Sequence, residues 1–401
     1  MTNSEGTKDI HVVIVGISFA GMNVSKALAK LQHPGLRITM IDQRAYYYHT
    51  IGMPRALVDR ELAKSLAFPL AGFLDQYEQD PSNPRHRFIQ ASVTNVTTTS
   101  VSLNDGSTVP FDFLVLATGV SNTFPATVST PSIEDAKTQL TTVHANVEKA
   151  KQILVIGGGA VGVESAGELA DAYPEKQVTL VHSGPHLLPS IFKPALHSSA
   201  LNKLQALGVR IVLNERVDIP ENTVFDCAVR PMELHGSSGT VYQSDLQLLA
   251  TGASPNARYI QSLEDSLGVK LRDPNGAIRV RPTLQLDSDA CDNIFVPGDV
   301  NNLPAGSKFA MVATPQAELV AANIKAMIDS LSNGQDKPLA LKQWDNRVAS
   351  ACIIPLGRSK GVGQLFGIVL GNSRFADFIV RNLKGKDYFV STAAKNFKSS
   401  K

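Results

Sequence analysis

Cysteine is scarce in this chain of 401 residues, and long apolar runs are missing. The three cysteines, Cys227, Cys291 and Cys352, lie 64 and 61 residues apart. This spacing excludes a disulfide framework, a Cys-x-x-Cys redox pair and a cysteine-rich zinc cluster, so no metal site is expected. Few cysteines are also typical of a reducing compartment. No apolar run approaches the roughly 18 residues of a membrane-spanning helix, and the sequence therefore predicts none.

An excess of one charge is missing as well. The 38 basic and 36 acidic side chains give a net charge of +2 with histidine neutral, so a nucleic-acid partner is not expected. The N-terminal residues lack the basic start and apolar stretch of a secretory signal. Position 2 is not glycine, which argues against N-myristoylation. We expect an intracellular protein that is not secreted.

The chain does contain one pattern twice. In each copy a β-branched strand enters a glycine-rich turn, a helix-like stretch and a second apolar run follow, and the copy closes on an apolar run ending in Ala-Thr-Gly. The segments are HVVIVGISFAG (11–21), RITMID (37–42) and FLVLATG (113–119), then ILVIGGGAVGVE (153–164), QVTLVH (177–182) and LQLLATG (246–252). This order predicts an α/β protein with two Rossmann-like dinucleotide-binding domains, each a parallel sheet wrapped by helices.

The rest of the chain predicts how these domains are divided. NIFVPGDV (293–300) is expected to be a strand ending in Gly-Asp, a helical pattern covers 313–329, and SNGQDKP (332–338) has the composition of a linker. The second domain would thus be inserted in the first, with a small C-terminal α/β cap containing strands in SACIIPLG and GVGQLFGIVLG. The predicted ranges are 1–125 with 255–331, 126–254, and 339–401.

The second glycine turn satisfies the G-x-G-x-x-G pattern with Gly157, Gly159 and Gly162. Such glycines allow a tight turn, close approach of the backbone to a pyrophosphate, and close packing of helix on strand. The following strand ends at His182, where an acid would repel the 2′-phosphate of NADPH. Histidine would not, so weak discrimination between NADH and NADPH is expected. A solvated histidine without a cofactor role is the alternative.

The first glycine turn departs from the pattern, because Ser18 stands between Gly16 and Gly21. A decayed fold that binds nothing is one interpretation. Asp42 argues against it, since an acid at that strand end accepts hydrogen bonds from ribose hydroxyls. Asp299 is placed to accept from the ribityl chain of a flavin, unless it is an ordinary turn residue. The next helix would point its N-terminal dipole at the flavin ring.

The predicted dinucleotide contacts come from the two glycine turns, the strand ends that follow them, the two Ala-Thr-Gly segments and the Gly-Asp region. They are Gly16, Ile17, Ser18, Phe19, Ala20, Gly21, Asp42, Thr118, Gly119, Gly157, Gly159, Gly162, His182, Thr251, Gly252, Asp299, Lys308, Phe309 and Ala310.

Together these motifs resemble the two-dinucleotide-binding-domain flavoproteins, in which the first domain binds FAD and the second binds NADH or NADPH. Four motifs are more specific: GGGAVGVESAGEL (157–169), YPEKQVTLVHSG (173–184), GVGQL (361–365) and KDYFVSTAAK (386–395). They resemble the apoptosis-inducing-factor-like, mitochondrion-associated group of NAD(P)H:quinone oxidoreductases, which includes ferroptosis suppressor proteins. Type II NADH dehydrogenases are more distant relatives.

The resemblance implies electron transfer from NAD(P)H through FAD to a quinone or another hydrophobic acceptor. It also implies that Arg55 contacts FAD and that the backbone of Ile89 contacts the adenine. Glu164 would lie near the flavin–nicotinamide junction, and Lys384, beside an expected strand KDYFVST, at the flavin edge on the quinone side. These two are the candidate catalytic residues, because a Glu or Lys with a shifted pKa can relay protons to a quinone. A helix-surface carboxylate and a solvated lysine are the alternatives.

Several features leave alternatives open. The aromatic cluster Tyr46, Tyr47, Tyr48 and His49 is expected to pack as core or interface, with packing beside the cofactor as the alternative. The basic segment 381–401 is either a solvated tail or a weak contact to anionic lipid, as on a lipid droplet or the mitochondrial outer face. Rival functions are the reduction of a small electron-transfer protein and a redox-sensing role in which nucleotide binding switches conformation. The oligomeric state is not indicated.

Overall fold

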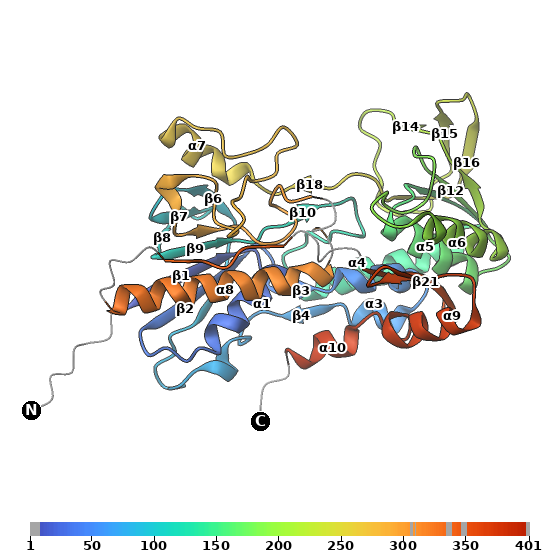
Figure 1. The fold of residues 1–401 in the computed structure, drawn as a ribbon. Helices are drawn as coiled ribbons and strands as arrows, with labels where there is room; N and C mark the ends of the chain where they lie inside the picture. The colour runs from blue at the N-terminus through green and yellow to red at the C-terminus, as the bar shows by residue number, and fades with distance from the viewer. Residues whose placement is uncertain (1–8, 305–307, 309, 334–338, 346–350, 398–401) are drawn as a thin grey trace, which may run out of the picture.

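The computed structural model describes residues 9–304, 308, 310–333, 339–345 and 351–397 and contains a parallel five-stranded sheet near the N-terminus (Figure 1). Four of its strands are almost wholly buried, as is typical of parallel sheets covered on both faces, whereas the edge strand over 87–90 is exposed or half-buried. The last strand comes from a distant part of the chain, after the second sheet is complete. The spatial order is β19 (Ile294–Phe295), β9 (Phe113–Leu116), β1 (Ile10–Val15), β2 (Leu36–Asp42) and β5 (Arg87–Gln90).

The second parallel sheet has four strands and repeats the design of the first. In this sheet helix α5 (Ala160–Ala172) follows the strand over 152–156, as helix α1 (Phe19–Ala29) follows β1 in the first sheet. Helices α4 (Ile133–Lys149) and α6 (Pro194–Ala206) belong to the same part of the chain. The order is β13 (Arg210–Val212), β12 (Gln177–Val181), β11 (Gln152–Ile156) and β17 (Leu246–Leu249). The prediction of two Rossmann-like folds is confirmed.

Helix α8 (Ala310–Asn333) covers the first sheet together with α1, and the two helices run side by side (Figure 1). Their contact is apolar, since Val24 and Leu28 of α1 share a core cluster with Ala317 and Val320 of α8. The helix predicted over 313–329 is confirmed. Of the described helices, none is both long and apolar enough to span a membrane.

Two chain segments connect the two folds, and they lie against each other. The first follows β9 and contains β10 (Val120–Ser121), and the second follows β17 and contains β18 (Ser254–Pro255). They pair antiparallel, with Val120 opposite Pro255. The chain therefore leaves the first fold and returns to it at adjacent points.

Short elements surround the two sheets. Antiparallel sheets of two or three strands are formed by β3 (Tyr46–Tyr48) with β4 (Ala67–Pro69), by β6 (Val93–Val96), β7 (Ser100–Leu103) and β8 (Thr108–Pro110), and by β14 (Val217–Asp218), β15 (Met232–Gly236) and β16 (Val241–Ser244). The short helices are η1 (Thr50–Gly52), α2 (Met53–Ala56), α3 (Arg60–Lys64), η2 (Asp75–Tyr77), η3 (Arg258–Ile260), α7 (Gln261–Leu267) and η4 (Asp289–Cys291).

The C-terminal segment forms an antiparallel sheet packed on α5. Gly167 of α5 has no room for a side chain, because a Cβ there would lie 2.8 Å from the Cα of Leu356. The strands expected in SACIIPLG and GVGQLFGIVLG are confirmed. The elements are β20 (Cys352–Leu356), β21 (Lys360–Leu365), β22 (Ile368–Leu370), α9 (Arg374–Val380), a π-helical turn η7 (Arg381–Gly385) and α10 (Val390–Lys395).

The strand predicted for KDYFVST is wrong. Tyr388 and Phe389 have left-handed backbones, with φ of 52° and 63°, and a helix begins at Val390. The Asp387 carboxylate accepts hydrogen bonds from the backbone N–H groups of Phe389 and Ser391, both at 3.0 Å. An acidic side chain that satisfies the free N–H groups at a helix start favours the helix over a strand.

Candidate functional site

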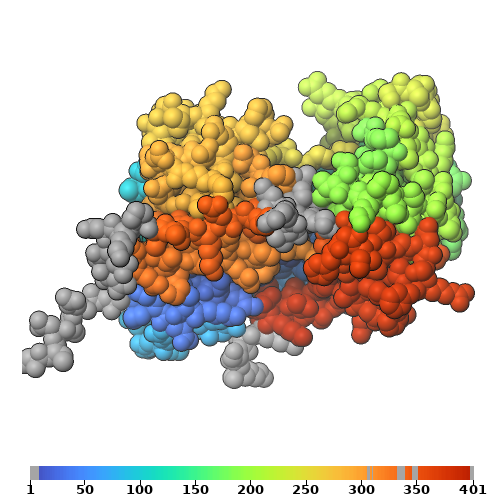
Figure 2. Space-filling model, viewed as in Figure 1, coloured from blue at the N-terminus to red at the C-terminus, as the bar shows by residue number. Residues whose placement is uncertain are grey.

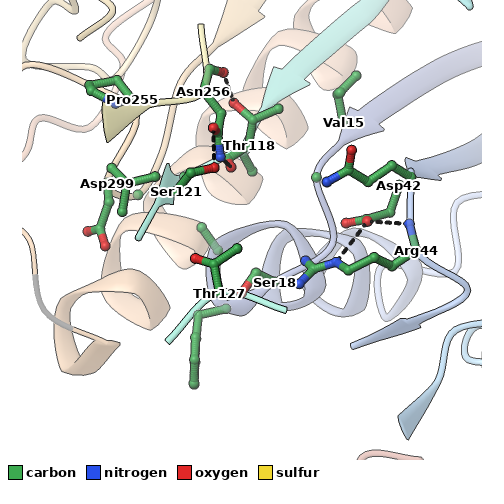
Figure 3. Close-up of a pocket in the computed structure, with 18 of the residues that line it drawn as sticks. Val15, Ser18, Asp42, Arg44, Thr118, Ser121, Thr127, Pro255, Asn256 and Asp299 are labelled. Atoms are coloured by element: carbon green, nitrogen blue, oxygen red, sulfur yellow. Dashed lines mark hydrogen bonds and ion pairs between the residues drawn. The ribbon is translucent and has the colours of Figure 1, made fainter. Parts of the chain in front are cut away.

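A cavity of about 750 Å³ opens at the carboxyl ends of β1, β2 and β9 (Figure 3). This edge of a parallel sheet is where ligands bind in open α/β folds. Nine of the predicted contact residues line the cavity. They are Gly16, Ser18, Phe19, Ala20, Asp42, Thr118, Gly119, Asp299 and Ala310.

The β1–α1 turn has the geometry of a dinucleotide-binding turn despite Ser18. Gly16 has a φ of 87°, and a Cβ there would lie 2.6 Å from the carbonyl oxygen of Ala117. Gly21 packs behind the turn, where a Cβ would lie 1.9 Å from the Gly16 carbonyl oxygen. Ser18 is the N-cap of α1 and makes no side-chain capping bond in the described structure. Its hydroxyl therefore remains available on the cavity wall.

Asp42 closes this turn from the end of β2. Its carboxylate accepts the Ile17 N–H at 2.8 Å and the Arg44 N–H at 3.0 Å, and the Arg44 Nε lies 3.4 Å away. Ile17 itself is buried and contributes its backbone. Figure 3 shows Asp42 and Arg44 together at one end of the cavity, with Asp299 at the other side.

Asp299 lines the cavity where β19 leads toward α8. Enclosure of its carboxyl raises its pKa to about 6, against the opposing charge of Lys308. The Lys308 ammonium donates to the backbone carbonyls of Asp299, at 2.8 Å, and Asn301. Ala310 begins α8, so a helix N-terminus does face the cavity. Phe309 lies outside the described residues.

Asn256 and Tyr259, which the sequence analysis missed, complete the wall beside Thr118. The Thr118 hydroxyl donates to the Asn256 carbonyl at 2.7 Å and lies 2.8 Å from the Tyr259 hydroxyl. The Asn256 side chain donates back to the Thr118 carbonyl at 3.0 Å. Both residues follow closely after the second Ala-Thr-Gly segment, and this position in the sequence could have indicated them as cavity residues. A cavity of this volume, lined by the glycine turn, by Asp42 and by Asp299, fits FAD.

The turn of the second fold repeats the geometry of the first. A Cβ on Gly157, whose φ is 117°, would lie 2.4 Å from the Ala250 carbonyl oxygen and 3.0 Å from Thr251 Cγ2. A Cβ on Gly162 would lie 1.9 Å from the Gly157 carbonyl oxygen. Gly159 faces open space, with nothing within 4 Å of its Cβ position. Gly252, with a φ of 57°, ends the neighbouring strand segment. Backbones of this shape leave room for the close approach of a pyrophosphate.

His182 lies over this second turn and is not a solvated histidine. Its Nδ1 accepts the Gly158 N–H at 3.1 Å, and a Cβ on Gly158 would lie 2.7 Å from its ring. Burial lowers the pKa of His182, and the neighbouring His186 lowers it further. The side chain at the strand end is thus engaged with the turn through its Nδ1.

The two candidate catalytic residues, 220 positions apart, meet in a buried ion pair. Glu164 lies in the first half of α5 and Lys384 in η7, and their side chains are 5% and 12% exposed. Burial raises the pKa of Glu164 to about 7, although the charge of Lys384 acts in the opposite direction. The helix-surface carboxylate and the solvated lysine are therefore both wrong. Neither residue lines the cavity. The helix that carries Glu164, α5, is connected to the cavity through α2, which packs against α5 and follows Thr50 of the cavity wall in the chain.

Arg55 is not on the cavity wall, where the sequence analysis expected it. Its guanidinium binds Glu168, with Nε 2.5 Å from Oε2 and Nη2 2.9 Å from Oε1. It also donates to the carbonyls of Gly357 and Gly385, both at 3.1 Å. Tyr388 donates its hydroxyl to Glu168 at 2.7 Å. Because its guanidinium is already bound to these groups, Arg55 connects α2 and α5 to the C-terminal segment.

Ile89 is also absent from the cavity wall. It is half-buried on β5, and the wall is formed by the residues just after it, Ala91, Ser92 and Val93. The cavity wall on this side is thus formed two residues further along the chain than the sequence analysis expected. Tyr46, Tyr47, Tyr48 and His49 are all buried, as expected of core aromatics, and Tyr48 also lines the cavity.

The three cysteines are buried and unpaired. Burial raises the pKa of Cys352 to about 11 and that of Cys227 to about 12, so both are thiols at neutral pH. Among the described residues, no three His, Cys, Asp or Glu side chains are grouped to hold a metal ion.

Comparison with known proteins assigns the fold to a class. Residues 10–318 match the family described as pyridine nucleotide-disulphide oxidoreductase, and the chain belongs to that family. It is an oxidoreductase that uses FAD and NAD(P)H. The solved structures support the fold alone: NDH2 from Plasmodium falciparum with NADH (14% identity, TM-score 0.68, covering 97% of this chain and 98% of that one) and the sulfide:quinone oxidoreductase of Aquifex aeolicus (19%, 0.68, 96% and 92%).

Within the family, the chain is similar to a narrower group. It is 29% identical over 394 residues to ferroptosis suppressor protein 1 of Homo sapiens, covering 98% of this chain and 96% of that protein. It is 27% identical over 407 residues to apoptosis-inducing factor homolog A of Dictyostelium discoideum, covering 96% and 91%. The resemblance drawn from the motifs is thereby confirmed.

Proposed function

We propose that this protein transfers electrons from NADH or NADPH, by way of FAD, to a quinone or a similarly apolar small acceptor. In this proposal residues 1–125 and 255–331 bind FAD, 126–254 bind the nicotinamide coenzyme, and 339–401 shape the approach of the acceptor. The observation that carries it is the buried Glu164–Lys384 pair, which joins the coenzyme-side helix α5 to the C-terminal segment.

Quinone reduction consumes a hydride equivalent and one further proton. The bound FAD and NAD(P)H supply the redox chemistry. The protein has to supply the proton and to balance charge that develops on the acceptor oxygen. Glu164, with a pKa of about 7, can hold and release a proton near neutral pH. Lys384 provides a positive charge in a nearly dry environment, where it acts strongly on a developing anion.

Disulfide chemistry, which the family name includes, has no support in this chain. It requires a reactive cysteine pair, and reactive cysteines have a lowered pKa. Here burial raises the pKa of both Cys352 and Cys227. Cys352 is the cysteine whose pKa is influenced by Lys384 and Glu164, and it is a buried thiol. An acceptor other than a disulfide is therefore favoured.

The test separates the two half-reactions. The purified protein should carry FAD, anaerobic NADH should bleach the flavin absorbance, and a short-chain soluble quinone should restore it with steady-state turnover. Bleaching that only a small electron-transfer protein reverses would replace the quinone by that rival acceptor. Nucleotide binding without turnover on any acceptor would support the redox-sensing function instead.

A further inference from the structure

Two buried ion pairs lie one helical turn apart where the C-terminal segment meets α5. Glu164 binds Lys384 in the first pair, and Glu168 binds Arg55 in the second. The two glutamates are four positions apart and therefore share one face of the helix. Figure 2 shows the C-terminal segment, in red, directly against the second fold, in green. The pairs are enclosed, since their four side chains are between 1% and 12% exposed.

Tyr388 contacts both pairs at once. Its hydroxyl donates to Glu168 Oε1 at 2.7 Å. Its ring centroid lies 5.1 Å from the guanidinium carbon of Arg55 and 5.3 Å from the ammonium nitrogen of Lys384, close enough for both cations to interact with the ring. The side chain is fully buried, and burial raises the pKa of its hydroxyl well above the ordinary value. The hydroxyl therefore keeps its proton and remains a donor to Glu168.

The backbone of Tyr388 adopts an unfavourable conformation while it makes these contacts. Its φ is 52°, a left-handed value that a bulky residue rarely adopts. Its N–H donates to the Lys384 carbonyl at 2.8 Å, and its own carbonyl accepts from His49 Nε2 at 2.7 Å. All of its polar groups are thus engaged. Such strain persists only where the surroundings fix it, and it is concentrated at functional sites.

Glu168 has more donors around it than Glu164. Its Oε2 accepts from the Arg55 Nε, and its Oε1 accepts from both the Arg55 Nη2 and the Tyr388 hydroxyl. Both acceptor positions of Oε1 are thereby occupied. Glu164 has the Lys384 ammonium as its partner. Because a lysine side chain is flexible and its ammonium has three donors, an unoccupied position on Glu168 would offer Lys384 a second carboxylate.

We propose that Tyr388 is a positioning residue that assigns one cation to each glutamate. Its hydroxyl fills the remaining acceptor position on Oε1 of Glu168, and its ring and N–H hold Lys384 towards Glu164. Lys384 is thus kept as the undivided partner of the carboxyl that exchanges a proton. The use of that proton in quinone reduction rests on the proposed function, whereas the assignment of the two cations does not.

This arrangement sets the proton affinity of Glu164. Burial raises the pKa of Glu164 to about 7, the charge of Lys384 lowers it, and the charge of Glu168 raises it. Without the Tyr388 hydroxyl, Lys384 would be divided between the two carboxylates. Glu168 would also act on Glu164 as a less neutralised anion. Both changes favour the protonated form of Glu164, so the midpoint of its titration should rise.

Other ionisable side chains lie around the pairs. Burial lowers the pKa of His49, so its ring is neutral at pH 7. Burial raises the pKa of Cys352 to about 11. Burial opposes the ionisation of Asp387, but hydrogen bonds within its own turn lower its pKa overall. Asp59 is half-buried and is the N-cap of α3. A titration near pH 7 is therefore assigned by replacing Glu164 itself.

The test is an infrared pH titration of the FAD-loaded full chain, which follows the C=O band of protonated buried carboxyls. In wild type the band should titrate near pH 7, and Glu164→Gln should remove it. Tyr388→Phe keeps the ring and removes the hydroxyl. We expect it to raise the midpoint by about one pH unit, a tenfold change in proton affinity. The matched control, Tyr46→Phe, removes a buried hydroxyl that donates to the Thr130 carbonyl at 2.9 Å and should leave the midpoint unchanged.

A second comparison separates this role from a general loss of packing. In a Glu168→Gln background Lys384 has no second carboxylate, so adding Tyr388→Phe should not move the midpoint further. Flavin absorbance and thermal unfolding show whether each variant is folded. An unchanged or lowered midpoint in Tyr388→Phe, or an equal shift in the Glu168→Gln background, would overturn the inference. A band that survives Glu164→Gln would overturn it as well, whether or not Tyr388→Phe folds.

The same titration separates the inference from the proposed function. If Glu164 delivers the proton, the pH at which quinone turnover falls to half should rise in Tyr388→Phe by the same amount as the infrared midpoint. A shifted infrared midpoint in a protein that turns over no quinone would refute the proposed function and leave the role of Tyr388 standing. Quinone turnover with an unshifted midpoint would do the reverse.

Discussion

Replacing Lys384 by Met removes the positive charge of the buried pair while keeping a side chain of similar length. NAD(P)H reduction of FAD should stay within about threefold of wild type, because α5 and its glycine turn are unchanged. Turnover with a soluble quinone should fall by about 10- to 1000-fold, the range expected when proton delivery or acceptor positioning is lost.

The cost to stability depends on pH, because Glu164 loses its partner. A buried carboxylate left charged and alone would cost about 3–5 kcal/mol. Glu164 can avoid this by taking up a proton, since burial has already raised its pKa to about 7. At pH 8 that uptake costs about 1 to 2 kcal/mol, and the lost charged hydrogen bond adds a similar amount. The deficit is thus about 3 kcal/mol at pH 8 and about half of that at pH 6.

The sign follows from proton binding. In the variant the folded protein keeps a proton on Glu164 that the unfolded chain releases, so its stability relative to wild type falls as pH rises through 7. Thermal unfolding at pH 6 and pH 8 measures this, and stopped-flow measures the half-reactions. The matched control, Lys395→Met, changes an exposed lysine of α10. Equal losses in both half-reactions, or a stability deficit that does not grow with pH, would refute the reasoning.

Three further predictions concern the buried Arg55 and the two cofactor sites. Arg55→Leu should destabilise the protein by about 3–5 kcal/mol in thermal unfolding, because it leaves Glu168 buried without its cation; loss of FAD at unchanged stability would contradict this and favour a cofactor contact. The kcat/KM of the wild type for NADH and for NADPH should agree within about tenfold, or 1.4 kcal/mol. His182→Glu should shift kcat/KM toward NADH. A wild type that rejects NADPH by a thousandfold would contradict the argument from this position. Asp299→Ala should lower flavin occupancy, measured by absorbance of the purified protein, while Asp292→Ala, on an exposed acid bound to Arg281, should not.

The parts predicted well are those set by local backbone requirements. Gly16 and Gly157 are specified by a left-handed turn and by a carbonyl that leaves no room for a Cβ. The position of Asp42 was predicted from its place at a strand end. It lies 25 residues after Ile17, whose backbone N–H its carboxylate accepts. Such features repeat within a short window, so a single sequence is enough to find them.

The parts predicted poorly depend on contacts between distant segments. Arg55 and Glu168 are 113 residues apart, and Tyr388 is 220 residues from Glu168. The FAD contact expected for Arg55 came from the family resemblance, and nothing near Arg55 in the sequence points to Glu168 as its partner. The position of Ile89 away from the cavity wall has a related cause, since a shift of two residues along the strand brings a different backbone to the cavity. The KDYFVST error arose because strand propensity carries no information about the cap that Asp387 provides.

The pairing of β10 with β18 has a consequence for how such a protein can be altered. Because Val120 lies opposite Pro255, the two chain connections between the first fold and the second fold lie next to each other. A foreign fold with closely spaced ends could be joined at the same two points without lengthening either connection. We expect such an exchange to succeed only where the incoming fold also packs a helix against the C-terminal sheet, as Gly167 lets α5 do, and presents one glutamate to Lys384 and another to Arg55.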